Sequence, residues 1–344
     1  MKKIIIIILI FLLTGCYDYK ELNDLAIITG ISITKENNTY ILTSEIITID
    51  NQNKESKIYT GKGTTIYEAF NQINKDLSKK IYIDHLNILI LDETITKNNL
   101  SNILDFFGRN SNSKETTYIL ISKNIELLTN PNISSQIILE NLKENNKYLG
   151  ISNLVTLNDL IDNYLNPNKE ITIPSIEIIN NQIKLSTLAI FKNNKFLTYI
   201  SEEDSIIYNL LNNNINNTPM KIDYNNNQYI ITEIYNTNTI IKPKRNKLNI
   251  YIKGNASIKE IYYKCNLNNP KTLKKIENNL NNKLTKRITT SINNIKKYNT
   301  NIYNFKDIYY KYYPHSDYSK IKINIIPNIK IINTGNITED IYVK

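Results

Sequence analysis

The N-terminus carries a short apolar segment preceded by basic residues, and this segment decides where the rest of the chain must fold. Lys2 and Lys3 precede an unbroken apolar run over residues 4–13, and a Thr-Gly-Cys sequence then ends at Cys16. This order of charge, apolar run and small residues is typical of a secretory signal. As a helix the run would rise only about 15 Å, half of the hydrocarbon core of a bilayer, so we do not expect it to span a membrane.

The residues that end this segment, Leu13-Thr14-Gly15-Cys16, resemble the bacterial lipobox. In that motif a diacylglycerol is attached to the Cys sulfur and the signal is cut just before it. The alternative is a plain secretory signal in which Cys16 stands by chance. No later stretch is apolar enough to span a bilayer. We therefore expect residues 1–15 to be a signal peptide, and the chain to be held outside the cytoplasmic membrane by two acyl chains on Cys16.

The composition excludes several classes of protein. The chain has 344 residues and a mass of 40.0 kDa, which is length for two or three domains. Two Cys exclude a disulfide scaffold and a cysteine-rich zinc module, and two His leave little for histidine chemistry, so we expect no metal or cofactor. The net charge of +10 permits an anionic partner. The excess of Ile, Asn, Lys and Tyr matches AT-rich codons, however, so part of this charge carries no functional information.

The periodicity predicts alternating helices and strands first, and then mostly strands. In the N-terminal part we expect strands at 26–34, 39–49, 86–91 and 117–122, and helices at 100–107, 133–142, 157–165 and after a capping box formed by Thr65 and Glu68. In the C-terminal part we expect strands at 176–179, 185–191, 196–200, 229–235, 238–242, 247–258 and 322–332, with helices opening at Ser201 and at Pro270.

This pattern predicts an α+β fold with two to three domains, in which helices cover mixed or antiparallel sheets. We divide the chain into an N-terminal α/β-rich domain over 16–183 and a C-terminal α+β domain over 184–344, with 184–225 as a candidate separate subdomain. Pro327 lies inside the last strand, which favours an edge position or a bulge for that strand. Cys265 is interpreted as a strand residue packed in a core, with an exposed thiol as the alternative.

The helix that begins at Pro270 has one apolar face and several basic residues on its other faces. Its apolar residues recur about every 3.7 positions: Leu273, Ile276, Leu280, Leu284, Ile288, Ile292 and Ile295. Two interpretations are open at this point. The helix could lie on anionic lipid. It could also pack on a neighbouring sheet with a solvated basic back, which we favour because strands are predicted on both sides. Nucleic-acid binding is not expected of an exported chain.

No residue pattern indicates catalysis. His85 and His315 are far apart in sequence, and the chain has no Gly-x-Ser-x-Gly elbow. His85 precedes a buried-type strand, so we interpret it as a structural histidine. Gly61-Lys62-Gly63 before a helix could hold a phosphate on backbone amides. A lone Gly-x-Gly is weak support for a phosphate site, and a tight turn into the helix is the favoured interpretation.

Several segments, taken together and in order, resemble the pattern of one known family. The first runs from Cys16-Tyr17-Asp18 to Glu21-Leu22-Asn23-Asp24-Leu25, with Tyr17 where the family usually has Trp. The others are Gly61-Lys62-Gly63-Thr64-Thr65-Ile66-Tyr67-Glu68-Ala69, His85-Leu86, Leu104-Asp105-Phe106-Phe107-Gly108-Arg109, Ala189-Ile190-Phe191, Leu197 to Glu203, Tyr309 to Pro314, and Thr334-Gly335. Together these segments resemble the Ger(x)C family of spore germination lipoproteins. Near Pro314 that family often has a Trp and a longer insert, whereas here Tyr318 follows and the loop is short.

The resemblance implies three α+β domains, no catalytic residues and a lipid anchor at Cys16. It also implies assembly with an A subunit and a transporter-like B subunit of a germinant receptor, at the outer face of the spore inner membrane. The candidate partner-contact or family-motif residues are Asp18, Glu21, Leu22, Asn23, Gly61, Gly63, His85 and Arg109. The alternatives are a substrate-binding lipoprotein with a ligand pocket between domains, and a cortex-lytic enzyme with paired carboxylates in a deep cleft.

Overall fold

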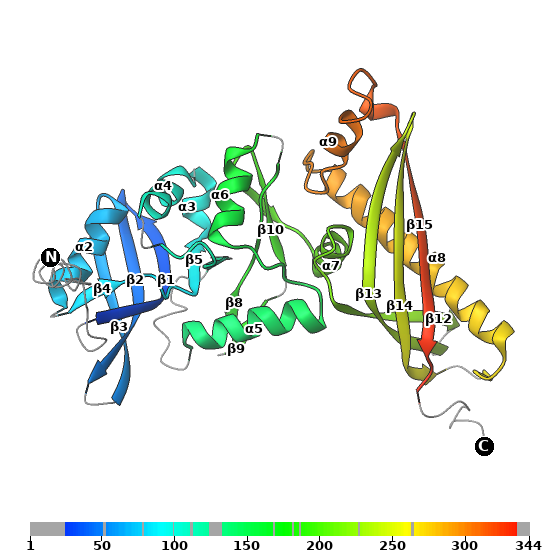
Figure 1. The fold of residues 1–344 in the computed structure, drawn as a ribbon, viewed down its shortest axis with the longest axis horizontal. Helices are drawn as coiled ribbons and strands as arrows, with labels where there is room; N and C mark the ends of the chain where they lie inside the picture. The colour runs from blue at the N-terminus through cyan, green and yellow to red at the C-terminus, as the bar shows by residue number, and fades with distance from the viewer. Residues whose placement is uncertain are drawn as a thin grey trace, which may run out of the picture.

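The computed structural model describes residues 25–335, with gaps at 51–52, 78, 99, 111–112, 124–132, 168, 181, 186, 226–227 and 263–264. Three units follow one another along the long axis: an N-terminal sheet with its helices, a middle unit around strand β10, and a C-terminal sheet with one long helix (Figure 1). The signal segment, Cys16, Asp18, Glu21, Leu22 and Asn23 lie outside the described residues, so their predicted roles are not tested by this fold.

The N-terminal sheet combines an antiparallel half with a parallel half. Its strands are β1 (Leu25–Glu36), β2 (Thr39–Asp50), β3 (Asn53–Gly63), β4 (Lys80–Tyr82), β5 (Ile88–Asp92) and β6 (Tyr118–Ser122), in the order β3-β2-β1-β5-β6 with β4 paired to β1. β1 and β2, both predicted as strands, form a hairpin that Asn37 and Asn38 close in two residues with positive φ angles of 44° and 70°. β3 was not predicted, because its residues are mostly polar and lack strand periodicity.

Both faces of this sheet are buried, and alternation along β5 divides its residues between two helical layers. Leu89 and Leu91 belong to the core shared with α2 (Ile66–Asp76), α3 (Glu93–Asn98), α4 (Ser101–Arg109) and α6 (Leu157–Leu165). Ile88 and Ile90 instead pack with α5 (Ser135–Tyr148) on the opposite face. A strand covered on both faces shows a continuous apolar run, which is why residues 86–91 were predicted as a buried strand.

The middle unit joins the two outer ones. It contains the sheet β11-β10-β7, a separate hairpin of β8 and β9, and helix α7, with bounds β7 (Thr172–Pro174), β8 (Glu177–Ile179), β9 (Gln182–Lys184), β10 (Leu188–Lys192), β11 (Lys195–Tyr199) and α7 (Glu202–Leu211). Along β10, Ala189 and Phe191 enter the N-terminal core, whereas Leu188 and Ile190 enter the C-terminal core. One strand therefore contributes to both cores.

The C-terminal unit is a four-stranded sheet with a long helix against one face. Its elements are β12 (Asn217–Asn225), β13 (Gln228–Lys244), β14 (Lys247–Tyr262), α8 (Pro270–Lys296), α9 (Phe305–Tyr310), a 3-10 turn (Tyr318–Lys320) and β15 (Lys322–Asn333), with strand order β12-β13-β14-β15. α8 begins at Pro270, as predicted, and the side chain of Asn269 accepts the Lys271 N–H and caps the helix. Ile276, Leu280, Leu284 and Ile288 are buried against the sheet, so the lipid-facing alternative for this helix is wrong.

The α+β class, with several sheets covered by helices, is therefore confirmed. The domain boundary at residue 184 stays a prediction. Cys265 follows β14 instead of lying in a strand, and it is partly buried against the C-terminal core. In the described part of the chain, no helix combines the length and the apolar character needed to cross a membrane.

The free edge of β15 is blocked by side chains of α8. Pro327 has no N–H to offer at this edge, as predicted for an edge strand. Asn281 then brackets Ile329: its Nδ2 donates to the Ile329 carbonyl at 3.1 Å, and its Oδ1 accepts the Ile329 N–H at 2.9 Å. The Ile331 N–H donates to Glu277 Oε1 at 3.0 Å. An unpaired edge is a template for pairing with another chain, and these contacts remove part of that template.

We predict that Asn281→Ala lowers the free energy of unfolding by about 1–2 kcal/mol, because two backbone groups of β15 lose their partner. Urea denaturation measures this change. Asn282→Ala is the matched control, since the Asn282 side chain is exposed and lies on the same helix. Equal losses in the two variants would contradict the role of Asn281 at the edge.

Candidate functional site

Gly61 and Gly63 lie at the end of β3 and permit α2 to pack directly on that strand. A Cβ at Gly61 would clash with the Ala69 carbonyl oxygen, and a Cβ at Gly63 would clash with the backbone at Glu68 and Ala69. Both glycines belong to β3, and the turn into α2 comes after Gly63. The predicted turn at the glycines themselves is wrong. Helix backbone fills the space beside both glycines, so their absent side chains serve packing and leave no phosphate cradle.

The first turn of α2 is fixed by two threonines and one carboxylate. Thr65 Oγ1 accepts the Glu68 N–H at 3.1 Å, as the predicted capping box requires. The carboxylate of Glu68 instead accepts the N–H and hydroxyl of Thr64, at 2.8 and 2.6 Å. These hydrogen bonds, led by that of the Thr64 hydroxyl, hold the pKa of Glu68 below its usual value. The first half of the predicted capping box, the bond to Thr65, is thus confirmed. In the second half, the Glu68 carboxylate accepts from Thr64 instead of from the backbone N–H of Thr65.

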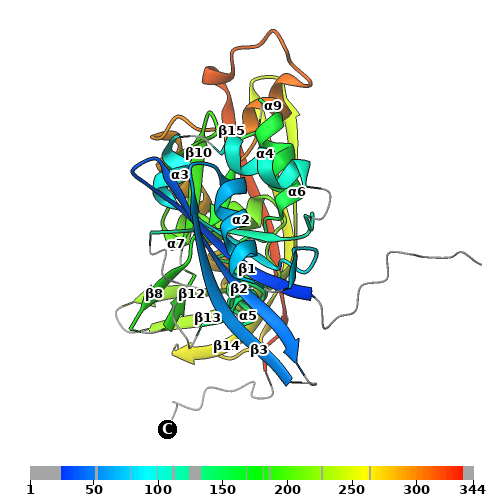
Figure 2. The same ribbon diagram turned by 90° about the vertical axis from the view of Figure 1, so that its left-hand side faces the viewer.

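Helix α4 lies next to α2 and holds the second motif segment. Asn102 Nδ2 donates to the Tyr40 hydroxyl at 3.1 Å, which ties α4 to the start of β2. Arg109 Nε donates to Asp105 Oδ1 at 2.7 Å, one helical turn away. The Phe106 ring packs toward α2, with its centroid 5.8 Å from that of Phe70. Figure 2, viewed from the N-terminal end, shows α2 and α4 side by side over the sheet.

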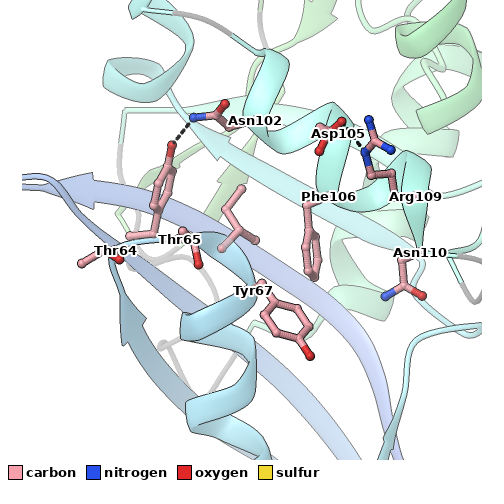
Figure 3. Close-up of a pocket in the computed structure, with 10 residues that line it drawn as sticks. Thr64, Thr65, Tyr67, Asn102, Asp105, Phe106, Arg109 and Asn110 are labelled. Carbon is pink, nitrogen blue, oxygen red and sulfur yellow. Dashed lines mark hydrogen bonds and ion pairs between the residues drawn. The ribbon is translucent and has the colours of Figure 1, made fainter.

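A groove of about 540 Å³ lies between these two helices. It is lined by Tyr40, Thr64, Thr65, Ile66, Tyr67, Asn102, Asp105, Phe106, Arg109 and Asn110. Figure 3 shows the rings of Tyr67 and Phe106 projecting into the space between α2 and α4, with the Asp105–Arg109 pair at the rim. Two segments more than 30 residues apart in sequence, both quoted for the family resemblance, therefore meet at one surface feature.

The groove has the chemistry of a protein contact surface. Tyr67 is 63% exposed although it is large and apolar for most of its area. The side chains of Arg109 and Asp105 are 79% and 59% exposed, so their ion pair is solvated and flexible. A second hollow, of about 440 Å³, lies on the other side of α4 and shares Asn102, Asp105 and Arg109 with the first; Leu165 at its edge is 72% exposed. An aromatic ring and an arginine are side chains enriched in binding hot spots.

The fold does not bring His85 to this groove. His85 lies in the turn between β4 and β5, its side chain is exposed, and its ring centroid is 5.9 Å from that of Tyr82. The interpretation of His85 as a structural histidine stays a prediction. His315 is also exposed, in the C-terminal unit. Within the described ranges, no group of three or more His, Cys, Asp or Glu side chains could hold a metal ion.

Of the candidate partner-contact residues named from the sequence, Arg109 lines the groove, whereas Gly61 and Gly63 pack against α2 and are not part of its lining. Tyr67 and Phe106 belong to the segments quoted for the family resemblance. Each of these segments also contains glycine and charged residues, and this combination was the only sequence pattern that could have indicated a contact surface. Tyr40 and Asn102 carried no such pattern, because their hydrogen bond joins residues 62 positions apart.

Comparison with known proteins gives matches to both halves of the chain. The model of the spore germination protein N-terminal domain matches residues 18–178, and that of the spore germination B3/GerAC-like C-terminal domain matches residues 186–335. Spore germination protein KC of Bacillus subtilis (strain 168) is 25% identical over 91% of this chain and 88% of its own length. Spore germination protein GerQC of Bacillus cereus is 26% identical over 72% of each chain.

Among solved structures, the crystal structure of the GerBC protein matches with a TM-score of 0.60 and 17% identity, over 88% of this chain and 97% of that one. This likeness confirms the fold. The two family matches define the class as spore germination proteins. The chain belongs to the GerAC/GerKC-like family of C subunits, as the sequence resemblance predicted.

We predict that Thr65→Ala lowers the free energy of unfolding by roughly 1 kcal/mol, because the Glu68 N–H loses its cap. The urea midpoint measures the change. Thr289→Ala is the matched control, since Thr289 is exposed and its hydroxyl bonds only to the Thr285 carbonyl of its own helix. A midpoint equal to that of the wild type would contradict the assignment of Thr65 as the cap.

Proposed function

We propose that this chain is a lipid-anchored, non-enzymatic subunit of a spore germinant receptor that assembles with A and B subunits. Its place is the outer face of the spore inner membrane, and its task is assembly or signal relay by contact. The family membership of both halves of the chain carries this proposal.

The anchor rests on the lipobox. Cys16 follows Leu13-Thr14-Gly15, and the described part of the chain contains no helix able to cross a membrane. Two acyl chains on the N-terminal Cys would hold the protein stably, whereas one would not. β1 begins at Leu25, so the segment between the lipid and the first strand is short.

The groove between α2 and α4 is the surface we assign to partner contact. Its exposed Tyr67 and Arg109 can bury apolar area and form a bidentate ion pair with a partner. Asp105 is the only carboxylate of the groove lining, and it is exposed and paired with Arg109. A cortex-lytic enzyme would need two carboxylates facing each other in a deep cleft, which this groove does not offer.

We predict that Cys16→Ala is processed inefficiently, stays unlipidated and is lost from the membrane fraction of spores. Fractionation with labelled fatty acid incorporation measures both effects. Normal membrane retention of that variant without incorporated lipid would contradict the anchor.

We also predict that Tyr67→Ala combined with Arg109→Ala reduces co-purification with the A and B subunits about tenfold or more, since two hot-spot side chains are lost. The unfolding midpoint should stay near wild type, because both side chains are exposed. Tyr148→Ala combined with Lys147→Ala is the matched control, as an exposed Tyr and its neighbouring cation on α5. Equal recovery of the subunits with both double variants would contradict this assignment of the groove.

A further inference from the structure

Another cavity, of about 520 Å³, lies where the middle and C-terminal units meet. Its walls come from the end of α8, the segment leading into α9, and the start of β15, while Glu170 from the loop before β7 closes it on the side of the middle unit. The apolar and aromatic wall residues are Ile292, Ile295, Tyr303, Phe305, Tyr310 and Tyr318.

The aromatic rings of this cavity are ordered against one another. Tyr303 and Phe305 are both buried and stack with ring centroids 5.1 Å apart and an interplanar angle of 20°. Tyr310 and Tyr318 contact each other with centroids 6.2 Å apart. The Tyr303 hydroxyl lies 2.9 Å from Ser291 Oγ, which fixes the ring. The rings of Tyr310 and Tyr318 are only partly buried, and an open aromatic face carries negative π-density, which attracts cations.

The charged residues around the cavity differ in how deeply they are buried. Glu170 is half-buried and forms no ion pair within the described ranges; it accepts a hydrogen bond from the Asn301 backbone. Burial raises the pKa of Glu170, against the weaker opposite effect of Lys192. The other charged lining residues, Lys296, Lys306 and Asp317, are exposed. Solvent screens these rim charges, so the charge that acts most strongly inside the cavity is negative.

A buried acceptor adds to this carboxylate. Thr300 lines the cavity, and its Oγ1 is buried without a hydrogen-bond partner among the described residues. Buried hydroxyls normally have a partner. A carboxylate and a hydroxyl oxygen beside aromatic rings match an ammonium group, which is a multiple donor with no acceptor.

We propose that this cavity is a binding site for a small organic ammonium ion with a flat apolar body. Its N–H groups would donate to Glu170 and Thr300, and its body would lie between the aromatic walls. Because Glu170 belongs to the middle unit and the rings to the C-terminal unit, such a ligand would bridge the two. This proposal is independent of receptor assembly and of the groove between α2 and α4.

Isothermal titration of the full mature chain in detergent, with a detergent blank, tests the proposal. The probe is 2-phenylethylammonium, and 3-phenylpropionate is a comparator of similar body and opposite charge. We expect the ammonium to bind with a dissociation constant of about 1 mM or tighter, and the carboxylate to bind at least about tenfold more weakly.

Glu170→Gln keeps the acceptor for the Asn301 backbone but removes the charge, and it should weaken ammonium binding about tenfold. Asp317→Asn, at the exposed rim, is the matched control and should leave the affinity within about twofold of wild type. Tyr318→Leu is a second variant that tests the site if Glu170→Gln fails to fold. It removes an aromatic wall and should also weaken the binding of 2-phenylethylammonium. Failure of the wild type to bind the ammonium, equal binding of the carboxylate, or unchanged affinity in both site variants would overturn the proposal.

Discussion

Helix α7 is buried on all sides beyond its first two residues, and the arrangement of the three units depends on how its polar groups are satisfied. Every residue from 204 to 211 is buried, including Asn209. The Asn209 amide donates to the carbonyls of Gly150 and Ile151, at 2.8 and 2.9 Å. A buried carbonyl left without a donor costs about 1–3 kcal/mol, so these two bonds restrict α7 to one orientation. Figure 1 shows α7 between the middle sheet and β13.

The neighbouring strand extends this constraint to both ends of the molecule. β10 places Phe191 in the core beneath α4 and Ile190 in the core beneath α8. Tyr208 of α7 accepts a hydrogen bond from Thr172 of β7 at 2.8 Å, and its ring centroid lies 6.2 Å from that of Tyr303. The groove at the N-terminal end and the cavity beside Glu170 therefore share one continuous packed interior.

Local patterns in the sequence predicted most of the elements, and contacts between distant residues account for those that were missed. The spacing of α8 identified both its apolar stripe and its start at Pro270, because a 3.6-residue period and a cap are local. β3 was missed because hydrogen bonds to β2, and not its own polar sequence, make it a strand. His85 precedes a buried strand, as expected, but the turn that exposes its side chain depends on the fold. The sequence showed the two motif segments that line the α2–α4 groove. It could not show that they lie side by side, because this depends on how α2 and α4 pack in the fold.

Hydrogen exchange of an Asn209→Ala variant tests the central claim, that α7 couples the units, most directly. If α7 holds the units together, the backbone amides of β10 and of β13 should both lose protection, by about tenfold or more, because two buried carbonyls lose their donor. Thr285→Ala on α8 serves as the reference, since its hydroxyl bonds only within its own helix. Loss of protection confined to α7 itself, with β10 and β13 unchanged, would contradict the account.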